Sequence, residues 1–291
     1  VWYVGRRGYQ TRGGHPGFGW FYNRQNVNQF LGFQEYWFTE NHYGELVDPV
    51  EAQWNSDLLL VDEIVKDLRS CLDGEGRPVF SFSVSYQNHG PYEWTYTANE
   101  TYLDPKTSGL PEESCYVFNN YLHGVNITIS AMTLLAQQLE EMEEPVVLVF
   151  FGDHLPYLGD NQLAYAELGF TARPEWDALT SYETPYVIWA NDAAAQALDW
   201  EAAVASLDLP EDGRLSASFL GAAVLELTGR TGESPWFDFL NQLRRELPVV
   251  QKQAYQVADG TVTDQLTEEQ AAKIAKWRQW SYYKLMYKEI D

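Results

Sequence analysis

An uninterrupted apolar run covers residues 146–151 (VVLVFF) and is rich in β-branched and aromatic side chains. This pattern is typical of a strand buried on both faces, as in a mostly parallel sheet covered by helices. The run ends at Gly152, and Asp153 and His154 follow directly. Because ligands of open α/β sheets bind beyond the carboxyl ends of the strands, these two side chains are candidates for a site. Capping by Asp153 and packing by His154 would explain the same local pattern.

The elements before this run suggest an α/β fold. Ser56 is a candidate N-cap for a helix with apolar positions at steps of three and four, and residues 79–86 alternate apolar residues with serine. A long amphipathic helix over residues 125–142 then leads into the 146–151 strand. A strand, a helix and a strand at this spacing predict a right-handed parallel crossover.

The remaining pattern predicts shorter elements and one large domain, 1–291, in which residues 250–291 form a hairpin and a terminal helix as an appendage. Residues 1–20 have no clear strand of their own, and residues 93–115 are interpreted as a polar loop. Further elements are predicted as follows: a helix at 23–31 ended by Gly32, an extended segment at 33–38, a strand at 184–190, helices near 216–228 and 235–246, a hairpin over 255–263 turning at Asp259-Gly260, and a last helix capped by Thr267 and Gln270.

Composition limits the classes of partner. The net charge of −23 argues against nucleic acid, and an anionic substrate would need a locally positive site made by a metal or by a few Arg and His residues. The 11 Trp and 19 Tyr residues favour aromatic packing or a surface for carbohydrate or lipid headgroups. Cys71 and Cys115 form no disulfide framework. Neither a membrane-spanning run nor a signal peptide is recognisable, so any anchor would lie outside this sequence.

Three of the five histidines and one arginine are the candidates for chemistry. His15, His89 and His154 lie in loops flanked by glycine or proline, where functional residues concentrate. His42 is interpreted as a surface residue, and His123 as a packing or capping residue at a helix start. Arg24 could hold a phosphate or sulfate bidentately, or form an ion pair with one of the 42 acidic residues.

Four motifs in order, GYQTRGGHPGFGWFYNR, SVSYQNHGPY, VVLVFFGDHLP and ETPYVIWAN, resemble the lipoteichoic acid synthase branch of the alkaline phosphatase/sulfatase superfamily. The resemblance implies a mostly parallel sheet flanked by helices and a divalent cation, with manganese expected and magnesium or zinc as alternatives. It implies transfer of a phosphoglycerol group from a glycerophospholipid to a cell-envelope polymer or glycan by a threonine nucleophile. It also implies an extracytoplasmic domain that follows transmembrane helices.

The resemblance assigns a role to each candidate. Asp153 and His154 match paired metal ligands, and His89 matches a histidine that holds the substrate phosphate or protonates the leaving group. His15, Tyr22 and Arg24 match the substrate pocket, with Arg24 at the headgroup-binding arginine.

Two departures from the family pattern stand out. Gly17 occupies the position of an aspartate in the better-known members, so the headgroup is left open. The family's threonine and first acidic metal ligand precede the GY-T motif, so we expect the chain to be the C-terminal two-thirds of the catalytic domain and weak or inactive by itself.

Three alternatives are kept. The first is a sulfatase or another phosphodiester or sulfate-ester hydrolase; neither Cys71 nor Cys115 fits the sulfatase maturation motif, which would lie before this segment. The second is phosphoethanolamine transfer, which usually accompanies more cysteines. The third is a non-catalytic binding domain with a degenerate site. Matching polar residues at five positions have little packing rationale, and this favours an enzyme.

Overall fold

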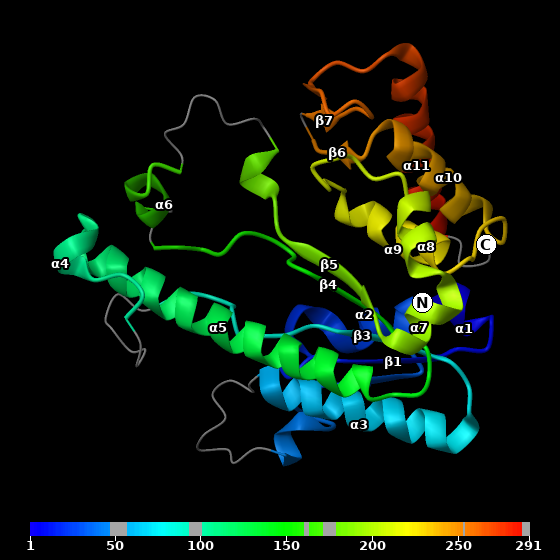
Figure 1. Cartoon of the computed structure of the whole chain (residues 1–291), viewed down its shortest axis with the longest axis horizontal. Helices are drawn as coiled ribbons and strands as arrows, with labels where there is room; N and C mark the ends of the chain where they lie inside the picture. The colour runs from blue at the N-terminus through cyan, green and yellow to red at the C-terminus, as the bar shows by residue number, and fades with distance from the viewer. Residues whose placement is uncertain (47–56, 93–100, 160–162, 171–178, 253, 287–291) are drawn as a thin grey trace. The chain divides into compact units, whose positions relative to one another are not determined.

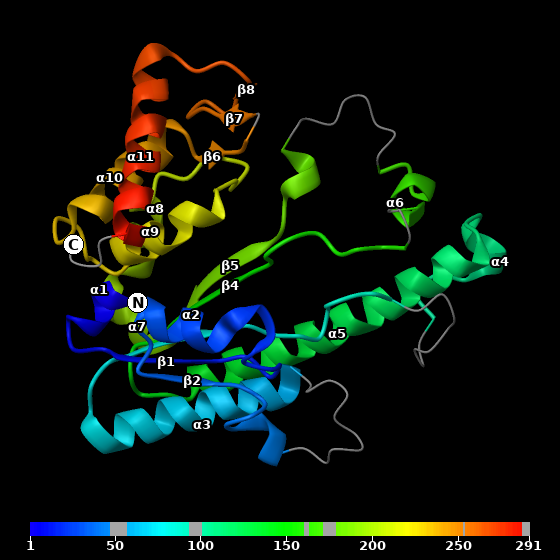
Figure 2. The same ribbon diagram turned by 180° about the vertical axis from the view of Figure 1, so that it is seen from behind.

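The computed structural model describes residues 1–46, 57–92, 101–159, 163–170, 179–252 and 254–286. The chain forms two compact units. The first unit comprises Val1–Glu141 and Pro156–Arg173, and the second comprises Met142–Leu155 and Pro174–Asp291. Figures 1 and 2 show the elements of both units from opposite sides.

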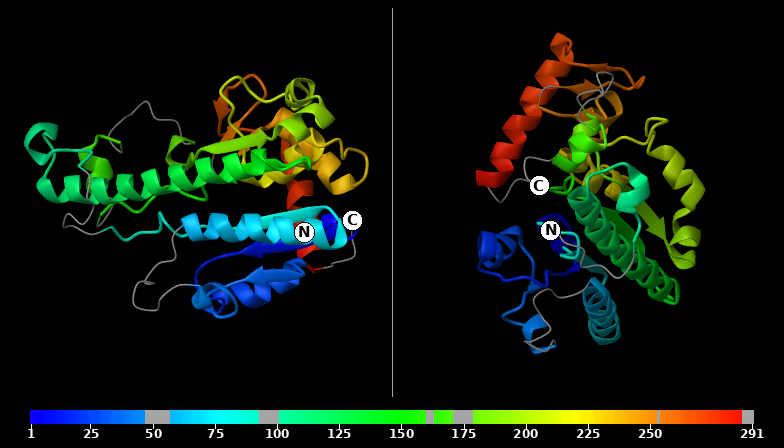
Figure 3. Two further views of the ribbon diagram at one scale, coloured as in Figure 1. Left: turned by 60° about the horizontal axis from the view of Figure 1, so that its bottom comes forward. Right: turned by 90° about the vertical axis from the view of Figure 1, so that its left-hand side faces the viewer.

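The first unit is built on a parallel three-stranded sheet in the order β2-β1-β3. Strand β1 (Gln10–Gly14) lies between β2 (Glu35–Trp37) and β3 (Val79–Ser83), with Gly13 opposite both Tyr36 and Phe82. Helix α3 (Asp57–Glu75) packs against β1, β3 and the 29-residue helix α5 (Glu112–Glu140), and α3 and α5 run alongside each other in Figure 3. The predicted α/β class, a parallel sheet flanked by helices, is confirmed.

The central strand of this sheet was missed in the sequence. Residues 1–20 were expected to hold no clear strand, yet β1 is paired on both sides, and a short helix α1 (Trp2–Gly5) precedes it. The segment QTRGG shows no apolar alternation, because its last two residues are glycines that allow neighbouring groups to lie close to the strand. A Cβ on Gly13 would overlap the carbonyl oxygen of Phe82 and the ring of Tyr36.

The second unit contains β4 (Val147–Phe151) and β5 (Tyr186–Ala190), which pair antiparallel with Val149 opposite Ile188. The prediction of a parallel crossover from 79–86 to 146–151 was therefore wrong. The crossover rule applies to strands of one sheet, and β4 shares its ladder with β5 rather than with β3. Burial on both faces was also wrong, because β4 is half-buried and Phe151 at its end is exposed.

A helical core fills the rest of the second unit. Helices α9 (Ala217–Leu227), α10 (Pro235–Glu246) and α11 (Glu268–Met286) enclose a cluster of buried side chains: Phe219, Ala222, Leu240, Leu243, Leu247 and Ile274. The helices predicted near 216–228 and 235–246 are thereby confirmed. The strands β6 (Val249–Val250), β7 (Tyr255–Gln256) and β8 (Val262–Thr263) form an antiparallel sheet, and Tyr255, from β7, packs against this cluster.

Local signals in the sequence were read correctly at several ends. Gly32 ends helix α2 (Arg24–Leu31) with φ 95°, and Gly260 turns the β7–β8 hairpin with φ 85°. The capping box is present: Thr267 N–H donates to Gln270 Oε1 at 3.0 Å, and Gln270 N–H donates to Thr267 Oγ1 at 3.2 Å. The predicted cap Ser56 lies outside the described residues.

The interpretation of residues 93–115 as a loop was wrong in its second half. Helix α4 (Pro105–Ser108) lies there, and α5 begins at Glu112. The acidic residues Glu112 and Glu113 are favourable in the first turn of a helix, where they lie in α5. The other short elements are η1 (Phe21–Asn23), η2 (Tyr43–Glu45), α6 (Leu163–Glu167), η4 (Thr180–Tyr182), α7 (Asp192–Leu198) and α8 (Trp200–Ser206).

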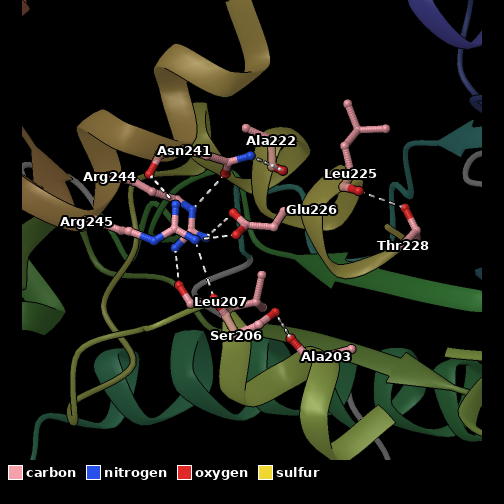
Figure 4. A network of polar contacts seen from close by, with 10 residues as sticks. All are labelled: Ala203, Ser206, Leu207, Ala222, Leu225, Glu226, Thr228, Asn241, Arg244 and Arg245. Atoms are coloured by element: carbon pink, nitrogen blue, oxygen red, sulfur yellow. Dashed lines mark hydrogen bonds and ion pairs between the residues drawn. The ribbon is translucent and has the colours of Figure 1, made fainter. Parts of the chain in front are cut away.

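A buried ionic network joins the helices of the second unit (Figure 4). The Arg244 guanidinium, 2% exposed, donates to Asn241 Oδ1 at 2.9 Å, to Glu226 Oε2 at 2.7 Å and to the Leu207 carbonyl. Arg245 binds the other oxygen of Glu226. Burial lowers the pKa of Arg244, and its hydrogen bond to Glu226 opposes that shift. All three nitrogens of the Arg244 guanidinium therefore have an acceptor. Removing Arg244 or Glu226 would leave the other charge unpaired inside the unit.

In the parts of the chain that the structure describes, no helix is long and apolar enough to cross a membrane.

Candidate functional site

Four of the six predicted site residues belong to the first unit, and two of them, His15 and His89, lie beside one tyrosine. His15 follows β1 and His89 lies in the loop after β3, and because these strands are parallel neighbours, both loops leave the same edge of the sheet. The Tyr86 ring lies 5.6 Å from the His15 ring and 5.2 Å from the His89 ring, nearly parallel to the latter at 12°. Tyr86 thus links the two histidines.

His15 is held in one orientation and one protonation state. It is 2% exposed, and its Nδ1 lies 2.9 Å from the Val84 carbonyl oxygen, which can only accept a hydrogen bond. Nδ1 therefore carries the proton, and Nε2 has a lone pair but no hydrogen-bond partner. Burial lowers the pKa of His15; the Val84 bond opposes this, and the charges of Arg24 and His89 add to it. The ring is therefore a neutral hydrogen-bond acceptor at Nε2.

Gly17 makes room for that ring. A Cβ at this position would lie 2.6 Å from His15 Nε2 and 3.0 Å from Cδ2, closer than van der Waals contact allows. The departure from the family's aspartate therefore has a steric consequence. With glycine, no side-chain atom of residue 17 fills the position beside Nε2, and the His15 ring can occupy its place against the Val84 carbonyl.

Arg24 supplies the positive charge of this site. Its guanidinium lies 5.4 Å from the Phe21 ring centroid and 5.2 Å from that of Tyr22, and it donates to the carbonyls of Phe18 and Phe21 at 3.4 Å. Within the described residues no carboxylate pairs with it, so the surface ion pair considered for Arg24 is not observed there. Tyr22 is 73% exposed and has a left-handed backbone with φ 55°. A cation held by carbonyls and ring faces keeps N–H donors for an anion.

His89 is exposed, and its Nδ1 lies 2.7 Å from the Gly90 carbonyl oxygen. Nδ1 therefore donates, and Nε2 is the nitrogen left to face a substrate.

The other two predicted site residues, Asp153 and His154, belong to the second unit, in the loop after β4. Their side chains are 80% and 70% exposed, and His154 Nε2 lies 3.6 Å from Asp153 Oδ2. His154 Nδ1 lies 2.8 Å from the Leu155 carbonyl oxygen, which leaves Nε2 as a lone-pair donor. An imidazole oriented by a carbonyl beside a carboxylate fits a divalent cation as two of its ligands. Across the described residues, no group of three or more His, Cys, Asp and Glu could hold a metal.

The loop of this pair is attached to the next strand. Thr184 Oγ1 donates to the Gly152 carbonyl at 2.8 Å, and Gly152 N–H donates to the Pro185 carbonyl at 3.1 Å. The end of β4 is thereby fixed immediately before Asp153.

Two histidines do not behave as the sequence indicated. His42, interpreted as a surface residue, stacks on Trp37 with ring centroids 3.9 Å apart and places Nε2 2.7 Å from Glu63 Oε2. No sequence pattern connects it to Glu63, which lies on α3, so this contact could not be anticipated. His123 lies inside α5 rather than at its start, and its Nδ1 is buried without a hydrogen-bond partner.

Comparison with known proteins assigns the chain. Residues 3–230 match the family model described as Sulfatase. The chain belongs to the sulfatase family. It is 30% identical over 236 residues to the "Putative cyclic beta-1,2-glucan modification protein" of Rhizobium meliloti (strain 1021), and the match covers 79% of this chain. That match covers 33% of the relative, so this sulfatase-family chain spans about a third of its length.

Solved structures share the fold. The Streptococcus pyogenes phosphoglycerol transferase GacH in complex with sn-glycerol-1-phosphate matches 98% of this chain and 66% of its own, with TM-score 0.62 and 18% identity. The Listeria monocytogenes lipoteichoic acid synthase LtaP matches 99% and 72%, with TM-score 0.59 and 16% identity. A Vibrio parahaemolyticus protein of the alkaline phosphatase superfamily matches 94% and 64%, with TM-score 0.54 and 16% identity.

Proposed function

We propose that this sulfatase-family chain takes part in metal-dependent transfer of a phosphoglycerol-type group from a glycerophospholipid to a cell-envelope glycan or polymer, on the extracytoplasmic face of the membrane. The observation that carries the proposal is Arg24. In an acidic chain it has no carboxylate partner within the described residues, and it lies close enough to His15 to lower the pKa of that histidine. Such a cation suits a phosphate ester.

Each residue of the first-unit group would have a separate task. Arg24 would donate N–H groups to the phosphate oxygens. His15 Nε2, being an acceptor, would receive a hydrogen bond from a hydroxyl group such as those of glycerol, and could not serve an anionic oxygen. Tyr22 would cover the headgroup with its exposed ring.

His89 would deliver the proton that the reaction needs. As an imidazolium it keeps its Nδ1–H on the Gly90 carbonyl and gives its Nε2–H to the departing oxygen. Loss of that proton leaves the neutral ring with Nδ1 still bound. The nucleophile is not assigned to a residue of this chain.

Asp153 and His154 would hold the divalent cation, with manganese expected and magnesium or zinc as alternatives. When bound, the cation would stabilise the negative charge that develops on the phosphoryl group. His154 must be neutral to act as a ligand, which agrees with its Nδ1–H being directed at the Leu155 carbonyl.

The acceptor class is suggested by the curated relative, which is described as modifying a cyclic β-1,2-glucan. The donor class is suggested by GacH, which was solved with sn-glycerol-1-phosphate. A glucan acceptor and a phosphoglycerol donor together define the first pair of substrates to supply.

The test is an assay with phosphatidylglycerol vesicles, cyclic β-1,2-glucan and manganese, with mass spectrometry of the glucan. Addition of a glycerophosphate to the glucan, lost with EDTA and in His89→Ala, supports the proposal. Because the family is described as Sulfatase, parallel reactions contain 4-nitrophenyl sulfate or bis(4-nitrophenyl) phosphate. Turnover of the sulfate ester alone would contradict the proposal and indicate that the protein is a sulfatase. No turnover together with binding of sn-glycerol 1-phosphate would favour a non-catalytic binding domain.

The chain alone is expected to be weak or inactive, so the assay is run in two forms. One contains residues 1–291 and the other contains the longest available form of the protein. Metal-dependent turnover by residues 1–291 alone would contradict that expectation.

A further inference from the structure

The loop that carries His89 is held by a buried carboxylate from another part of the first unit. Asp57, the first described residue of α3, is 3% exposed. Its Oδ1 accepts hydrogen bonds from the backbone N–H groups of Tyr86 and Gln87, both at 3.2 Å. Its Oδ2 accepts a hydrogen bond from Thr128 Oγ1 at 2.9 Å.

Thr128 extends this contact to the next residue of the loop. It lies on α5, is 9% exposed, and its Oγ1 accepts a hydrogen bond from Asn88 Nδ2 at 3.0 Å. One turn earlier, Gly124 allows the loop to approach the helix, because a Cβ there would overlap Asn88 Oδ1. The Tyr92 hydroxyl holds the Asn88 carbonyl at 2.6 Å. The three residues before His89 are thus fixed from α3 and α5.

We propose that Asp57 and Thr128 are positioning residues for His89, and that through the Tyr86–Asn88 backbone they fix where the His89 ring points. The proposal rests on the function proposed above, in which His89 handles the proton of the departing oxygen. Neither residue touches substrate; both act through the loop.

Removing a carboxylate from water is costly unless hydrogen bonds replace its hydration, and here the N–H groups of Tyr86 and Gln87 and the Thr128 hydroxyl supply those bonds. A carboxylate that binds two consecutive amides also fixes the orientation of that backbone. The backbone of Tyr86 decides where its ring lies, and the His89 ring stacks on that ring at 12°.

The first variant is Thr128→Val, which keeps the shape of the side chain and removes the hydroxyl from Asp57 and Asn88. Thr128→Ser restores the hydroxyl. The matched control is Thr133→Val on the same helix, an exposed threonine whose Oγ1 is bonded to the Ile129 carbonyl. Asp57→Asn is a second route if Thr128→Val does not fold, since an amide still accepts hydrogen bonds but carries no charge.

The first measurement is the set of His89 ring proton shifts by NMR, assigned with His89→Gln, because ring-current shielding from Tyr86 reports the stack without any need for activity. We expect Thr128→Val to shift these signals toward the values of an unstacked histidine, Thr128→Ser to restore them, and Thr133→Val to leave them unchanged. His89 signals unchanged in both Thr128→Val and Asp57→Asn would overturn the proposal.

The second measurement is kinetic, in the form of the protein that turns over in the glucan assay. We expect Thr128→Val to lower kcat about tenfold while KM changes less than about twofold, because substrate affinity depends mainly on Arg24 and His15. Equal effects of Thr128→Val and Thr133→Val would overturn the proposal. If His89→Ala leaves turnover intact, the proposed function of His89 fails instead, and the NMR result still decides whether the pair positions the loop.

Discussion

The space beside His15 offers the sharpest test of how the site is built. In Gly17→Ala the added Cβ would lie 2.6 Å from His15 Nε2. The backbone of Gly17 is not in the left-handed region, so the substitution introduces the side-chain overlap and no backbone strain. Either the His15 ring or the backbone at residue 17 has to shift, and we expect the ring to move and to weaken the bond from Nδ1 to the Val84 carbonyl.

The magnitude follows from these contacts. Overpacking a buried site costs about 1–3 kcal/mol, and loss of one buried hydrogen bond costs about 1 kcal/mol. We expect the free energy of unfolding of the first unit to fall by about 2 kcal/mol. Displacing Nε2 removes the acceptor for a substrate hydroxyl, so the affinity for sn-glycerol 1-phosphate is expected to fall about tenfold, or ~1.4 kcal/mol.

The assay combines urea unfolding with calorimetric titration of sn-glycerol 1-phosphate. Gly74→Ala is the matched control, because Gly74 lies in α3 with no atom within 4 Å of its Cβ position; it is expected to be neutral or slightly stabilising. The double variant His15→Ala/Gly17→Ala separates the two effects. It removes the overlap, so it is expected to be more stable than His15→Ala and Gly17→Ala would predict by addition, while binding stays weak. Strict additivity, or wild-type affinity in Gly17→Ala, would refute this reasoning.

Three further predictions use the same two methods. Arg24→Lys replaces a bidentate donor by a point charge, so binding of sn-glycerol 1-phosphate should weaken about tenfold without loss of stability; undiminished affinity would remove Arg24 from the site. Arg244→Met leaves Glu226 without its buried partner and should lower the free energy of unfolding in urea by about 3–5 kcal/mol. Arg245→Met, at a more exposed position, should lower it by about 1 kcal/mol or less. Equal losses in the two variants would contradict the view that Arg244 is the buried partner of Glu226. Burial lowers the pKa of His15 below its usual 6.5, so at lower pH the unfolded chain binds a proton more readily than the folded chain does. The free energy of unfolding should therefore fall as the pH drops below 6.5, and it should fall less in His15→Gln. Identical pH profiles of the two proteins would refute this.

The parts of the fold that the sequence predicted well are those encoded by local rules. The capping box at Thr267, the C-terminal glycine Gly32 and the Asp259-Gly260 turn depend on residues within a few positions of one another. Strand β1 was not predicted because the need for glycine at position 13 comes from its neighbours on both sides, β2 and β3, which lie far along the chain. Pairing partners such as β5 for β4 depend on tertiary structure that no periodicity contains.

The candidate site divides in the same way. Loop position and chemistry were enough to select His15 and His89, and the structure brings both to Tyr86. The residues that hold the His89 loop, Asp57 and Thr128, could not be selected from the sequence. An aspartate at a helix start and a threonine inside a helix are common, and local hydrogen bonds to the backbone would account for both. Only the fold reveals that both side chains bind the same loop.

The path of the chain through the two units has a consequence for synthesis. The first unit takes residues 156–173 only after the chain has entered the second unit at Met142 and left it at Leu155. On the ribosome, Val117 and Phe118 of α5 therefore emerge well before Leu158 and Ala164, the partners that cover them in the folded protein. A chain truncated after residue 141 would leave that apolar face uncovered and available to chaperones. Strand β4, which precedes Asp153, is likewise translated before β5, its pairing partner. Neither unit can be completed, exchanged or inherited as a contiguous gene segment.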